Sequence, residues 1–398
     1  MKVIFITPVT PYKENMGGPS GHPYALMIER DPSIEIEIYS FNNNHFSSTQ
    51  IAEVERELNV KIHLLKKPSW VQWILKFHLA FIRCFLKYPI NYYIRISKNI
   101  VNEINIKHPD LLWVYSQEFS GIIKQFKGNN ILFTVPDCYS LHWYRSLGKL
   151  YTLKNVKLYV KNVINYYQHY RMESNYECSP NIRFHLVGEE DVKFLKEICP
   201  KANAQFYRHP HYEVYQPAKV IKFSSPKIKL LIAGRYDLYS YQAADEIIQM
   251  FCLHPEILND YELTFLGKGW EHSIELLKSH GCQINLITFV PDYIEEIVKH
   301  DIQLNPLSLG TGTKGKVLDA ITNGLLEIGT YYALENIAVE NNVSCIQYDN
   351  IEQLMNVLHD IPLHREKYEL IANNGRENLL KLHNRAEISS QLFGNIIL

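Results

Sequence analysis

The chain has 398 residues, 46% hydrophobic and 21% charged, which predicts two domains of roughly 200 residues each and excludes extensive disorder. With 41 Lys and Arg against 42 Asp and Glu, the chain is nearly neutral and has no net positive charge to attract nucleic acid, so no nucleic-acid partner is expected. The seven cysteines are scattered and form no CxxC pair, which argues against a zinc site or a disulfide framework and predicts a cytoplasmic protein. The most apolar later window, 71–86, is interrupted by charged residues, so no membrane span is expected.

The first half of the chain alternates short β-branched segments with longer helical patterns. This alternation predicts a doubly wound parallel sheet covered by helices on both faces. The predicted strands are 3–7, 34–41, 61–65, 111–115, 131–135 and 183–187.

A glycine-rich segment follows the first predicted strand. Gly17, Gly18 and Gly21 precede an apolar helix that we expect to open near His22 or Pro23. Such a loop lies at the carboxyl edge of a parallel sheet, where Gly18 could let the backbone approach a ligand. A flexible loop without a ligand is an equal alternative, because GGPSG is not GxGxxG. His22 is a candidate catalytic base, or a hydrogen-bonded loop histidine.

The next segment contains no acidic residue between Glu57 and Glu103 but carries eight Lys and Arg from 61 to 98. Trp, Phe and Tyr residues from 70 to 93 interleave with these cations, as in a helix that lies at an anionic membrane interface. The alternative is a core-facing aromatic stripe with a solvated cationic face. We therefore hypothesise peripheral membrane contact through 61–98.

Three polar residues follow the predicted strand 131–135. Asp137 comes directly after the strand and is a second candidate catalytic base, although an Asp in this place is also a common helix N-cap. His142 and Arg145 follow in the same loop or helix start and are candidates for contacts with a substrate, on the acceptor side if the reaction is a group transfer.

Residues 208–227 have scattered prolines and little periodicity, and predict a connector between domains 1–207 and 228–380. A final helix, 381–398, could cross back to the first domain. A second parallel sheet is predicted, with strands 228–233, 261–266, 284–289, 302–305, 327–330 and 345–348.

The loop after the predicted strand 302–305 is rich in glycine, threonine and lysine, and a helix is expected to start near 316–317. Free backbone N–H groups, the positive helix end, hydroxyls and ammonium groups would together hold a diphosphate. Asp319 in the first helical turns could accept hydrogen bonds from ribose, or be an acid favoured by the helix dipole. The candidate phosphate contacts are Gly310, Thr311, Gly312, Thr313, Lys314 and Lys316.

The run GTGTKGKVLDAITNGL, 310–325, resembles the donor site of bacterial GT-B glycosyltransferases of family four. Similar resemblances are found in MKVIFITPVTPY, RFHLVGEEDVKFL, LLIAGRYD and YELTFLGKG, so nearly the whole chain is covered. The resemblance implies an α/β fold of two Rossmann-like doubly wound domains that face a cleft, the first binding the acceptor and the second the nucleotide-sugar.

The resemblance also implies roles for single residues. Arg235 would contact the donor phosphates, Val290 and Tyr293 would flank the base, and Asp319 would hold the ribose. The implied reaction moves a hexose-type sugar, with retention, to a glycan or lipid-linked acceptor in surface polysaccharide or glycoconjugate synthesis. Thr311 stands where the family commonly has Glu.

No DxD motif occurs, so catalysis without a metal is expected, with the nucleotide-sugar as co-substrate and no other cofactor. Leu326 and Glu327 stand where the family has Pro and an apolar residue. These departures leave two alternatives open, a nucleotide-sugar epimerase of GT-B-like fold and a degenerate, non-catalytic partner protein. The sequence does not identify the base, the sugar, the acceptor or the oligomeric state.

Overall fold

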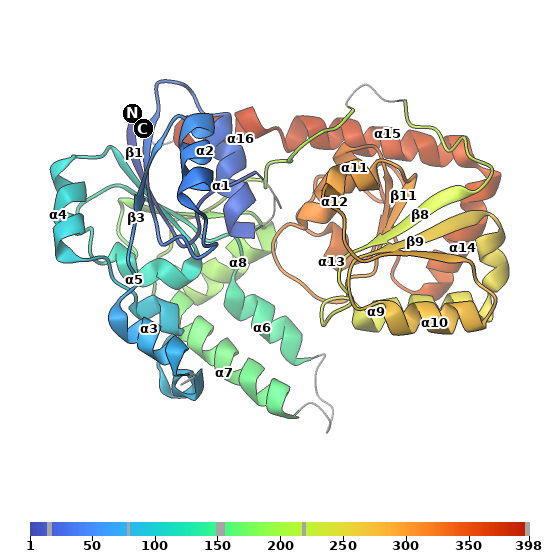
Figure 1. The fold of residues 1–398 in the computed structure, drawn as a ribbon, viewed down its shortest axis with the longest axis horizontal. Coiled ribbons are helices and arrows are strands. Elements are labelled where there is room, and N and C mark those ends of the chain that lie inside the picture. The colour runs from blue at the N-terminus through green and yellow to red at the C-terminus, as the bar shows by residue number, and fades with distance from the viewer. Residues whose placement is uncertain (14–17, 78–79, 149–155, 217–219, 395–398) are drawn as a thin grey trace. The chain divides into compact units, whose positions relative to one another are not determined.

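The computed structural model describes residues 1–13, 18–77, 80–148, 156–216 and 220–394. The chain divides into two compact units, each built around one parallel sheet (Figure 1). Unit 1 comprises Met1–Pro210 with Arg385–Leu398, and unit 2 comprises His211–Asn384.

Unit 1 has a seven-stranded sheet in the order β3-β2-β1-β4-β5-β6-β7, and every neighbouring pair is parallel. The strands are β1 (Lys2–Thr7), β2 (Glu35–Ser40), β3 (Lys61–Leu64), β4 (Leu111–Tyr115), β5 (Ile131–Thr134), β6 (Ile182–Leu186) and β7 (Ala204–Phe206). The predicted doubly wound fold class is therefore confirmed, and β7 at the edge is a strand that the sequence pattern does not predict.

Both faces of this sheet are covered, as the central strand β1 demonstrates. Val3 and Phe5 pack into one hydrophobic cluster and Ile4 and Ile6 into another, and all four side chains are fully buried. Helices α1, α2 and α16 contribute to the first cluster, and α3, α4, α5, α7 and α8 to the second. A strand buried on both faces reads as a continuous apolar run, which is why β1 is recognisable from sequence.

The helices of unit 1 include one from the C-terminal end of the chain. They are α1 (Gly18–Ile28), α2 (Ser48–Leu58), α3 (Ser69–Lys76), α4 (Lys98–Ile106), α5 (Ser120–Ile123), α6 (Tyr139–Leu147), α7 (Val156–Glu173), α8 (Glu189–Ile198) and α16 (Arg385–Gly394), with 3₁₀ helices η1 (Ala80–Phe85), η2 (Ile90–Tyr93) and η3 (Gln117–Phe119). The Oγ of Ser389 in α16 donates to the carbonyl of Leu26 in α1 at 2.8 Å, so α16 belongs to the core of unit 1.

Unit 2 has a six-stranded parallel sheet in the order β10-β9-β8-β11-β12-β13. Its strands are β8 (Ile228–Ala233), β9 (Tyr261–Leu266), β10 (Ile284–Ile287), β11 (Ile302–Asn305), β12 (Leu326–Gly329) and β13 (Ile346–Gln347). Its helices are α9 (Tyr241–Leu253), η5 (Pro255–Asn259), α10 (Glu271–Ser279), α11 (Tyr293–Ile297), α12 (Gly315–Thr322), α13 (Tyr331–Leu334), α14 (Ile351–Leu363) and α15 (Arg365–Leu382).

Two local predictions need correction. Helix α1 begins at Gly18 rather than near His22 or Pro23, because residues 21–27 are buried and packing outweighs the low helix propensity of Gly and Pro. Gly17 lies outside the described residues. The cationic stretch 61–98 is not one helix but is divided among β3, α3, η1 and η2. Within the described residues, no helix is both long and apolar enough to cross a membrane.

Candidate functional site

The candidate donor site lies where the strand order of unit 2 reverses. Strands β8 and β11 are neighbours, but the chain continues from β8 towards β9 and from β11 towards β12, on opposite sides. The loops that follow β8 and β11 therefore diverge at the carboxyl edge of the sheet, where open α/β sheets bind ligands. A hydrogen bond from Ser308 N to the carbonyl of Tyr239, at 2.8 Å, joins the two loops.

The loop between β11 and α12 is tightly folded and leads into a helix without a side-chain cap. Gly312 has φ +62°, a left-handed conformation that favours glycine. A Cβ on Gly310 would lie 3.0 Å from Cε of Lys314, so the loop is tightly folded. Helix α12 begins at Gly315, and no side chain caps its N-terminus. Uncapped N–H groups and the positive end of the helix dipole form an anion-binding arrangement.

The two lysines of this loop have different surroundings. Lys314 is largely buried, and its Nζ donates to the carbonyls of Thr311 at 3.1 Å and Gly312 at 2.8 Å. Its Nζ also lies 3.6 Å from a carboxylate oxygen of Glu335. Lys314 therefore holds the loop in shape.

Lys316, the second residue of α12, is exposed and has no hydrogen-bonding or ion-pair partner for its ammonium among the described residues. Its Nζ lies 5.6 Å from the centre of the Tyr293 ring and 3.8 Å from where a Cβ of Gly234 would be. Desolvation by the surrounding groups lowers the pKa of Lys316, against the attraction of Asp237 and Asp319. Lys316 is thus the lysine of this loop that is available for an added anion.

The loop after β8 approaches the same place with its backbone. Gly234 has φ +140°, and its carbonyl accepts a hydrogen bond from Nε1 of Trp270 at 2.8 Å. A Cβ on Gly267 would lie 2.1 Å from the carbonyl oxygen of Gly234, so the loops after β8 and β9 can meet only with glycine there. Arg235 follows Gly234 and is exposed, and its guanidinium has no hydrogen-bond or ion-pair partner among the described residues.

Asp319 lies in the second turn of α12 with 5% of its surface exposed, and its Oδ1 has no hydrogen-bond partner among the described residues. Burial raises the pKa of Asp319 well above its ordinary value, and Lys316 opposes this shift. Val290 and Tyr293 pack beside it against the cluster that contains Ala320 of α12. The structure therefore brings Asp319, Lys316 and Tyr293 together on one side of the sheet.

A buried polar network beneath this loop was not predicted as part of the site. The carboxyl of Glu327 accepts hydrogen bonds from Asn305 at 2.6 Å and Gln303 at 3.2 Å. Gln303 also donates to the carbonyl of Lys316 at 3.2 Å and accepts from Tyr293 at 3.3 Å. Burial raises the pKa of Glu327 well above its ordinary value. The alternation of Gln303, Asn305 and Glu327 with apolar neighbours was the available sequence signal.

In unit 1, His22 is buried at the corresponding place, beside the strand order reversal between β1 and β4. Its Nδ1 lies 3.0 Å from Oη of Tyr115 at the end of β4, and its Nε2 has no partner among the described residues. Burial lowers the pKa of His22 well below its ordinary value, and the neighbouring His209 and His185 lower it further. His22 could act as a base only if Nδ1 carries the proton and donates to Tyr115.

His22 belongs to a cluster of three histidines that the sequence did not indicate. Its ring centre lies 4.7 Å from that of His209 and 5.6 Å from that of His185. Nδ1 of His185 lies 3.1 Å from Oγ1 of Thr134, which accepts a hydrogen bond from Nε1 of Trp113 at 2.7 Å. Burial lowers the pKa of His185 to about 3 and that of His209 to about 4, so the cluster is neutral at physiological pH.

We expect the variant His185→Asn to lose less stability on acidification than the natural chain. The folded protein keeps His185 neutral while the unfolded chain takes up a proton below about pH 6.5, so stability falls as pH drops from 6.5 towards the folded pKa. For one such histidine the loss between about pH 7 and pH 5 is about 2 kcal/mol. Urea unfolding at both pH values measures it.

The natural chain must be compared with His185→Asn because Glu173 changes the free energy of unfolding with pH in the opposite direction. Burial raises the pKa of Glu173 to about 8, so its folded form binds a proton that the unfolded form releases, and stability falls as pH rises above 4.5. This contribution is the same in both proteins. An equal pH dependence of the free energy of unfolding in the two proteins would contradict the neutral histidine cluster.

The candidates after β5 lie around the start of α6. The N-cap residue is Cys138, and its N–H donates to Asp191 at 2.8 Å, while the N–H of Tyr139 donates to Glu173 at 2.9 Å. The carboxylates of Asp191 and Glu173 therefore occupy the helix start, and Asp137 precedes the cap position as a half-buried residue. His142 and Arg145 are half-buried within α6. Within the described residues, no group of three or more His, Cys, Asp or Glu could hold a metal ion.

No protein-family profile and no curated protein matches this sequence. Solved structures nevertheless resemble it along the full chain. HepE from Anabaena in complex with UDP has 11% identity and a TM-score of 0.63, covering 100% of both chains. Sucrose-phosphate synthase from Thermosynechococcus elongatus has 11% identity and a TM-score of 0.65, covering 100% of this chain and 98% of the synthase.

A third similar structure is WaaG, a glycosyltransferase involved in lipopolysaccharide biosynthesis. Its identity is 12% and its TM-score 0.60, covering 99% of this chain and 100% of WaaG. At such identities the likeness shows the fold alone. Two α/β units with parallel sheets of seven and six strands have the architecture of GT-B glycosyltransferases, as the sequence predicted.

Proposed function

We propose that this chain is a nucleotide-sugar-dependent glycosyltransferase related to GT-B family four. The observation that carries the proposal is the loop 310–316 at the reversal point of unit 2, with uncapped helix N–H groups and the available ammonium of Lys316. A diphosphate fits these donors, and the complexes of HepE with UDP and with UDP-glucose support a uridine nucleotide as the first ligand to test.

The donor would be held chiefly by residues of unit 2. Arg235, Lys316 and the amides of 310–315 would neutralise the diphosphate, and Val290 and Tyr293 would flank the base. Asp319 would accept hydrogen bonds from the ribose hydroxyls, because its Oδ1 lacks a partner among the described residues. Stabilising the departing nucleoside diphosphate is the main electrostatic task of such a transfer.

The acceptor would be held by unit 1, near His142 and Arg145 of α6. We propose transfer of a hexose-type sugar with retention of configuration, in which the departing phosphate assists the acceptor hydroxyl. The low pKa of His22 supports this over base catalysis by His22, because burial makes that imidazole a weak base. Asp137 is the remaining candidate base if the configuration inverts.

We expect transfer to proceed without a divalent metal. Lys316, Arg235 and the start of α12 would supply the positive charge that a metal otherwise provides. With UDP-glucose and a glycan acceptor, product formation with EDTA should equal that with added Mg²⁺, and proton NMR should show the donor's anomeric configuration in the product. A requirement for the cation contradicts this expectation.

Incubation of the donor alone distinguishes the rival activities. Release of an epimerised sugar nucleotide without an acceptor would indicate an epimerase, and failure to bind any nucleotide-sugar would indicate a non-catalytic partner protein.

We further propose that the enzyme works in the cytoplasm, at the inner face of the membrane, where its seven free cysteines stay reduced. Its role there would be in surface polysaccharide or glycoconjugate synthesis.

A further inference from the structure

The cationic stretch 61–98 has a counterpart elsewhere in unit 1. Between Asp137 and Glu173 the sequence again contains no acidic residue, while it carries six Lys and Arg and eight Tyr and Trp residues. The described residues of this second stretch form α6 and nearly all of α7. Unit 1 therefore has two segments, far apart in sequence, that share one composition.

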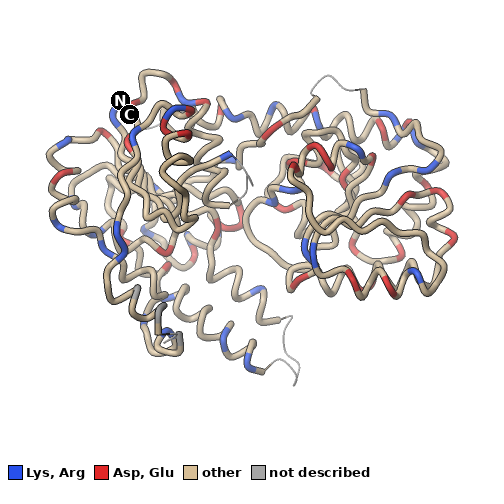
Figure 2. The backbone as a smooth tube through the Cα atoms, in the orientation of Figure 1, with Lys and Arg blue, Asp and Glu red and all other residues tan. Residues whose placement is uncertain are grey.

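The fold joins these two segments. Nε2 of Gln168 in α7 donates to the carbonyls of Arg83 at 2.6 Å and Leu86 at 2.8 Å, at the end of η1. Helices α3, α6 and α7 extend together from one end of unit 1 (Figure 1), and along α3, α6 and residues 156–172 of α7 the tube in Figure 2 is marked by Lys and Arg but by no Asp or Glu. We call α3, η1, α6 and residues 156–172 of α7 the cationic protrusion.

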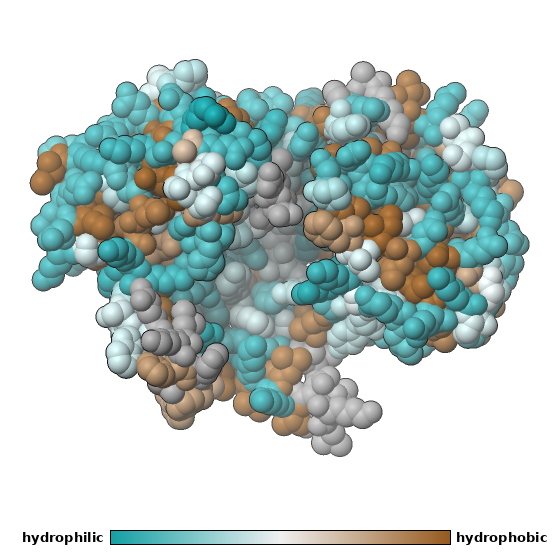
Figure 3. Space-filling model, viewed as in Figure 1, coloured by the Kyte–Doolittle hydropathy of each residue, from teal (hydrophilic) through white to brown (hydrophobic). Residues whose placement is uncertain are grey.

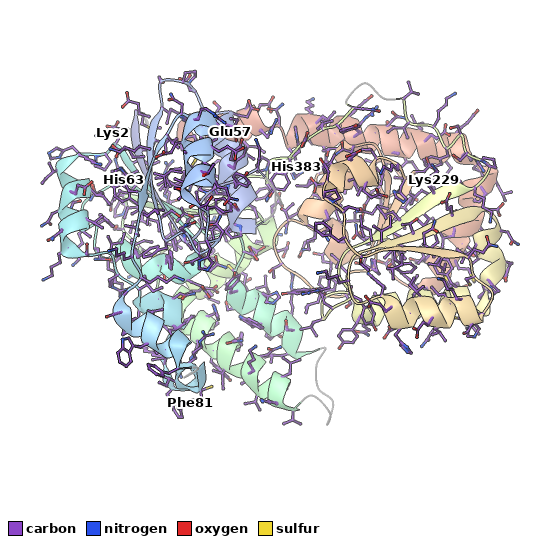
Figure 4. All side chains as sticks on the ribbon, viewed as in Figure 1. Lys2, Glu57, His63, Phe81, Lys229 and His383 are labelled. Atoms are coloured by element: carbon purple, nitrogen blue, oxygen red, sulfur yellow. The ribbon has the colours of Figure 1, made fainter. Side chains whose placement is uncertain are left out.

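The cationic protrusion exposes large apolar side chains. Phe85 is 83% exposed and Trp73 and Phe81 are each 63% exposed, while Val160 on α7 and Tyr144 on α6 are also exposed. Apolar residues gather at this end of unit 1 in Figure 3, and Figure 4 labels Phe81 at its outer end. Several exposed aromatics on one surface indicate an interaction site, because monomeric proteins rarely expose contiguous apolar area.

Its cations are exposed and available. Arg83, Lys157, Lys161 and Arg171 lie on its surface, and none of them forms an ion pair within the part of the chain that the structure describes. The half-buried Glu118 attracts Arg83, but α3, η1, α6 and residues 156–172 of α7 contain no acid of their own, so this surface is complementary to an anionic partner. Aromatic side chains among Lys and Arg match the layered chemistry of a bilayer, in which apolar groups enter below charged headgroups.

We propose that the cationic protrusion docks this protein onto a bilayer of anionic lipids and thereby selects a lipid-linked acceptor. The selection of a lipid-linked acceptor rests on the proposed function. Helix α6 begins at the carboxyl end of β5 and carries His142 and Arg145, and its exposed Tyr144 belongs to the protrusion. His142 and Arg145 are within two residues of Tyr144, which is about 3 Å along the helix axis, so the candidate acceptor contacts lie next to the docking surface.

Flotation of the full chain with vesicles tests the docking. Binding to phosphatidylcholine vesicles that contain phosphatidylglycerol should be strong at low salt, should weaken as salt rises, and should be weak with phosphatidylcholine alone. The double variant Lys157→Glu and Lys161→Glu should weaken binding by more than about tenfold, since each cation near an anionic surface accounts for about fivefold. This variant tests α7, which lies outside the stretch 61–98.

The double variant Phe81→Ser and Phe85→Ser tests the apolar part and should also reduce flotation at least about tenfold, since both side chains would leave the membrane interface. Matched controls lie in unit 2, where Leu253→Ser and Lys278→Glu change an exposed apolar residue and an exposed cation. Both controls should float like the natural chain. Unchanged circular dichroism and melting temperatures of all variants establish that they are folded.

Equal flotation on neutral and anionic vesicles, or flotation unaffected by both double variants, overturns the docking proposal. Preference for a nucleic acid over anionic vesicles in competition overturns it as well. Vesicle binding without any nucleotide binding rejects the proposed function but leaves the docking intact. Equal transfer rates to lipid-linked and free forms of one acceptor glycan reject the selection of a lipid-linked acceptor.

Discussion

Replacing Lys316 with alanine is expected to weaken UDP binding by about one to two orders of magnitude. A charge-assisted hydrogen bond to a phosphate contributes on the order of 1.5–3 kcal/mol, and each 1.4 kcal/mol is about tenfold in affinity. The ammonium of Lys316 has no competing partner among the described residues, so little of this contribution is lost to rearrangement. Isothermal titration calorimetry with UDP measures the change directly.

Two further lysine variants show whether the effect is specific. Lys278→Ala removes an exposed cation of α10 in the same unit and should leave UDP affinity unchanged. Lys314→Ala removes the donor to the carbonyls of Thr311 and Gly312, so it should lower the melting temperature without nucleotide as well as weaken binding. Natural affinity in Lys316→Ala would exclude the loop 310–316 as the phosphate site.

The parallel sheets were predictable because their central strands are buried on both faces. Strands β4, β8, β9 and β11 have the predicted limits to the residue, because β4 is a continuous apolar run and the other three carry apolar residues between polar turns. The edge strand β7 has only three residues, Ala204–Phe206, and one of them is the polar Gln205. Three residues contain too little alternation to stand out from a loop.

The donor-side loop was predictable because its chemistry is local in sequence. Residues 310–319 lie within one strand–loop–helix segment, so spacing alone brings the glycines, the lysines and Asp319 together. The different environments of Lys314 and Lys316 were not predictable, since they depend on Glu335, Gly234 and Tyr293 from other elements.

The site in unit 1 depends on contacts between distant segments. His22 meets Tyr115 across 93 residues of chain, and Gln168 meets Arg83 across 85. No periodicity in one segment encodes such a contact. The burial of the histidine cluster and the joining of the two acid-free stretches therefore emerged only from the fold.

Asp319→Ala is expected to weaken UDP binding at least tenfold without destabilising the nucleotide-free protein. A buried polar atom without a partner costs about 1–3 kcal/mol of folding free energy, and Oδ1 of Asp319 is such an atom among the described residues. Its removal offsets the small void that alanine leaves. Thermal unfolding without nucleotide should give an unchanged or higher melting temperature, whereas calorimetry should show the loss of affinity.

The matched variant Glu327→Ala should destabilise the nucleotide-free protein. Both carboxyl oxygens of Glu327 are hydrogen-bonded, and its removal would leave the buried amide of Asn305 without this acceptor and that of Gln303 with only the carbonyl of Lys316. Unfolding free energy should fall by about 3 kcal/mol. Removal of the two buried carboxyl groups would then affect the stability of the nucleotide-free protein differently, because only the carboxyl oxygens of Glu327 are hydrogen-bonded within the described part of the fold. If Asp319→Ala destabilises as much as Glu327→Ala, Asp319 is a structural residue, and its unpartnered oxygen does not await a ribose hydroxyl.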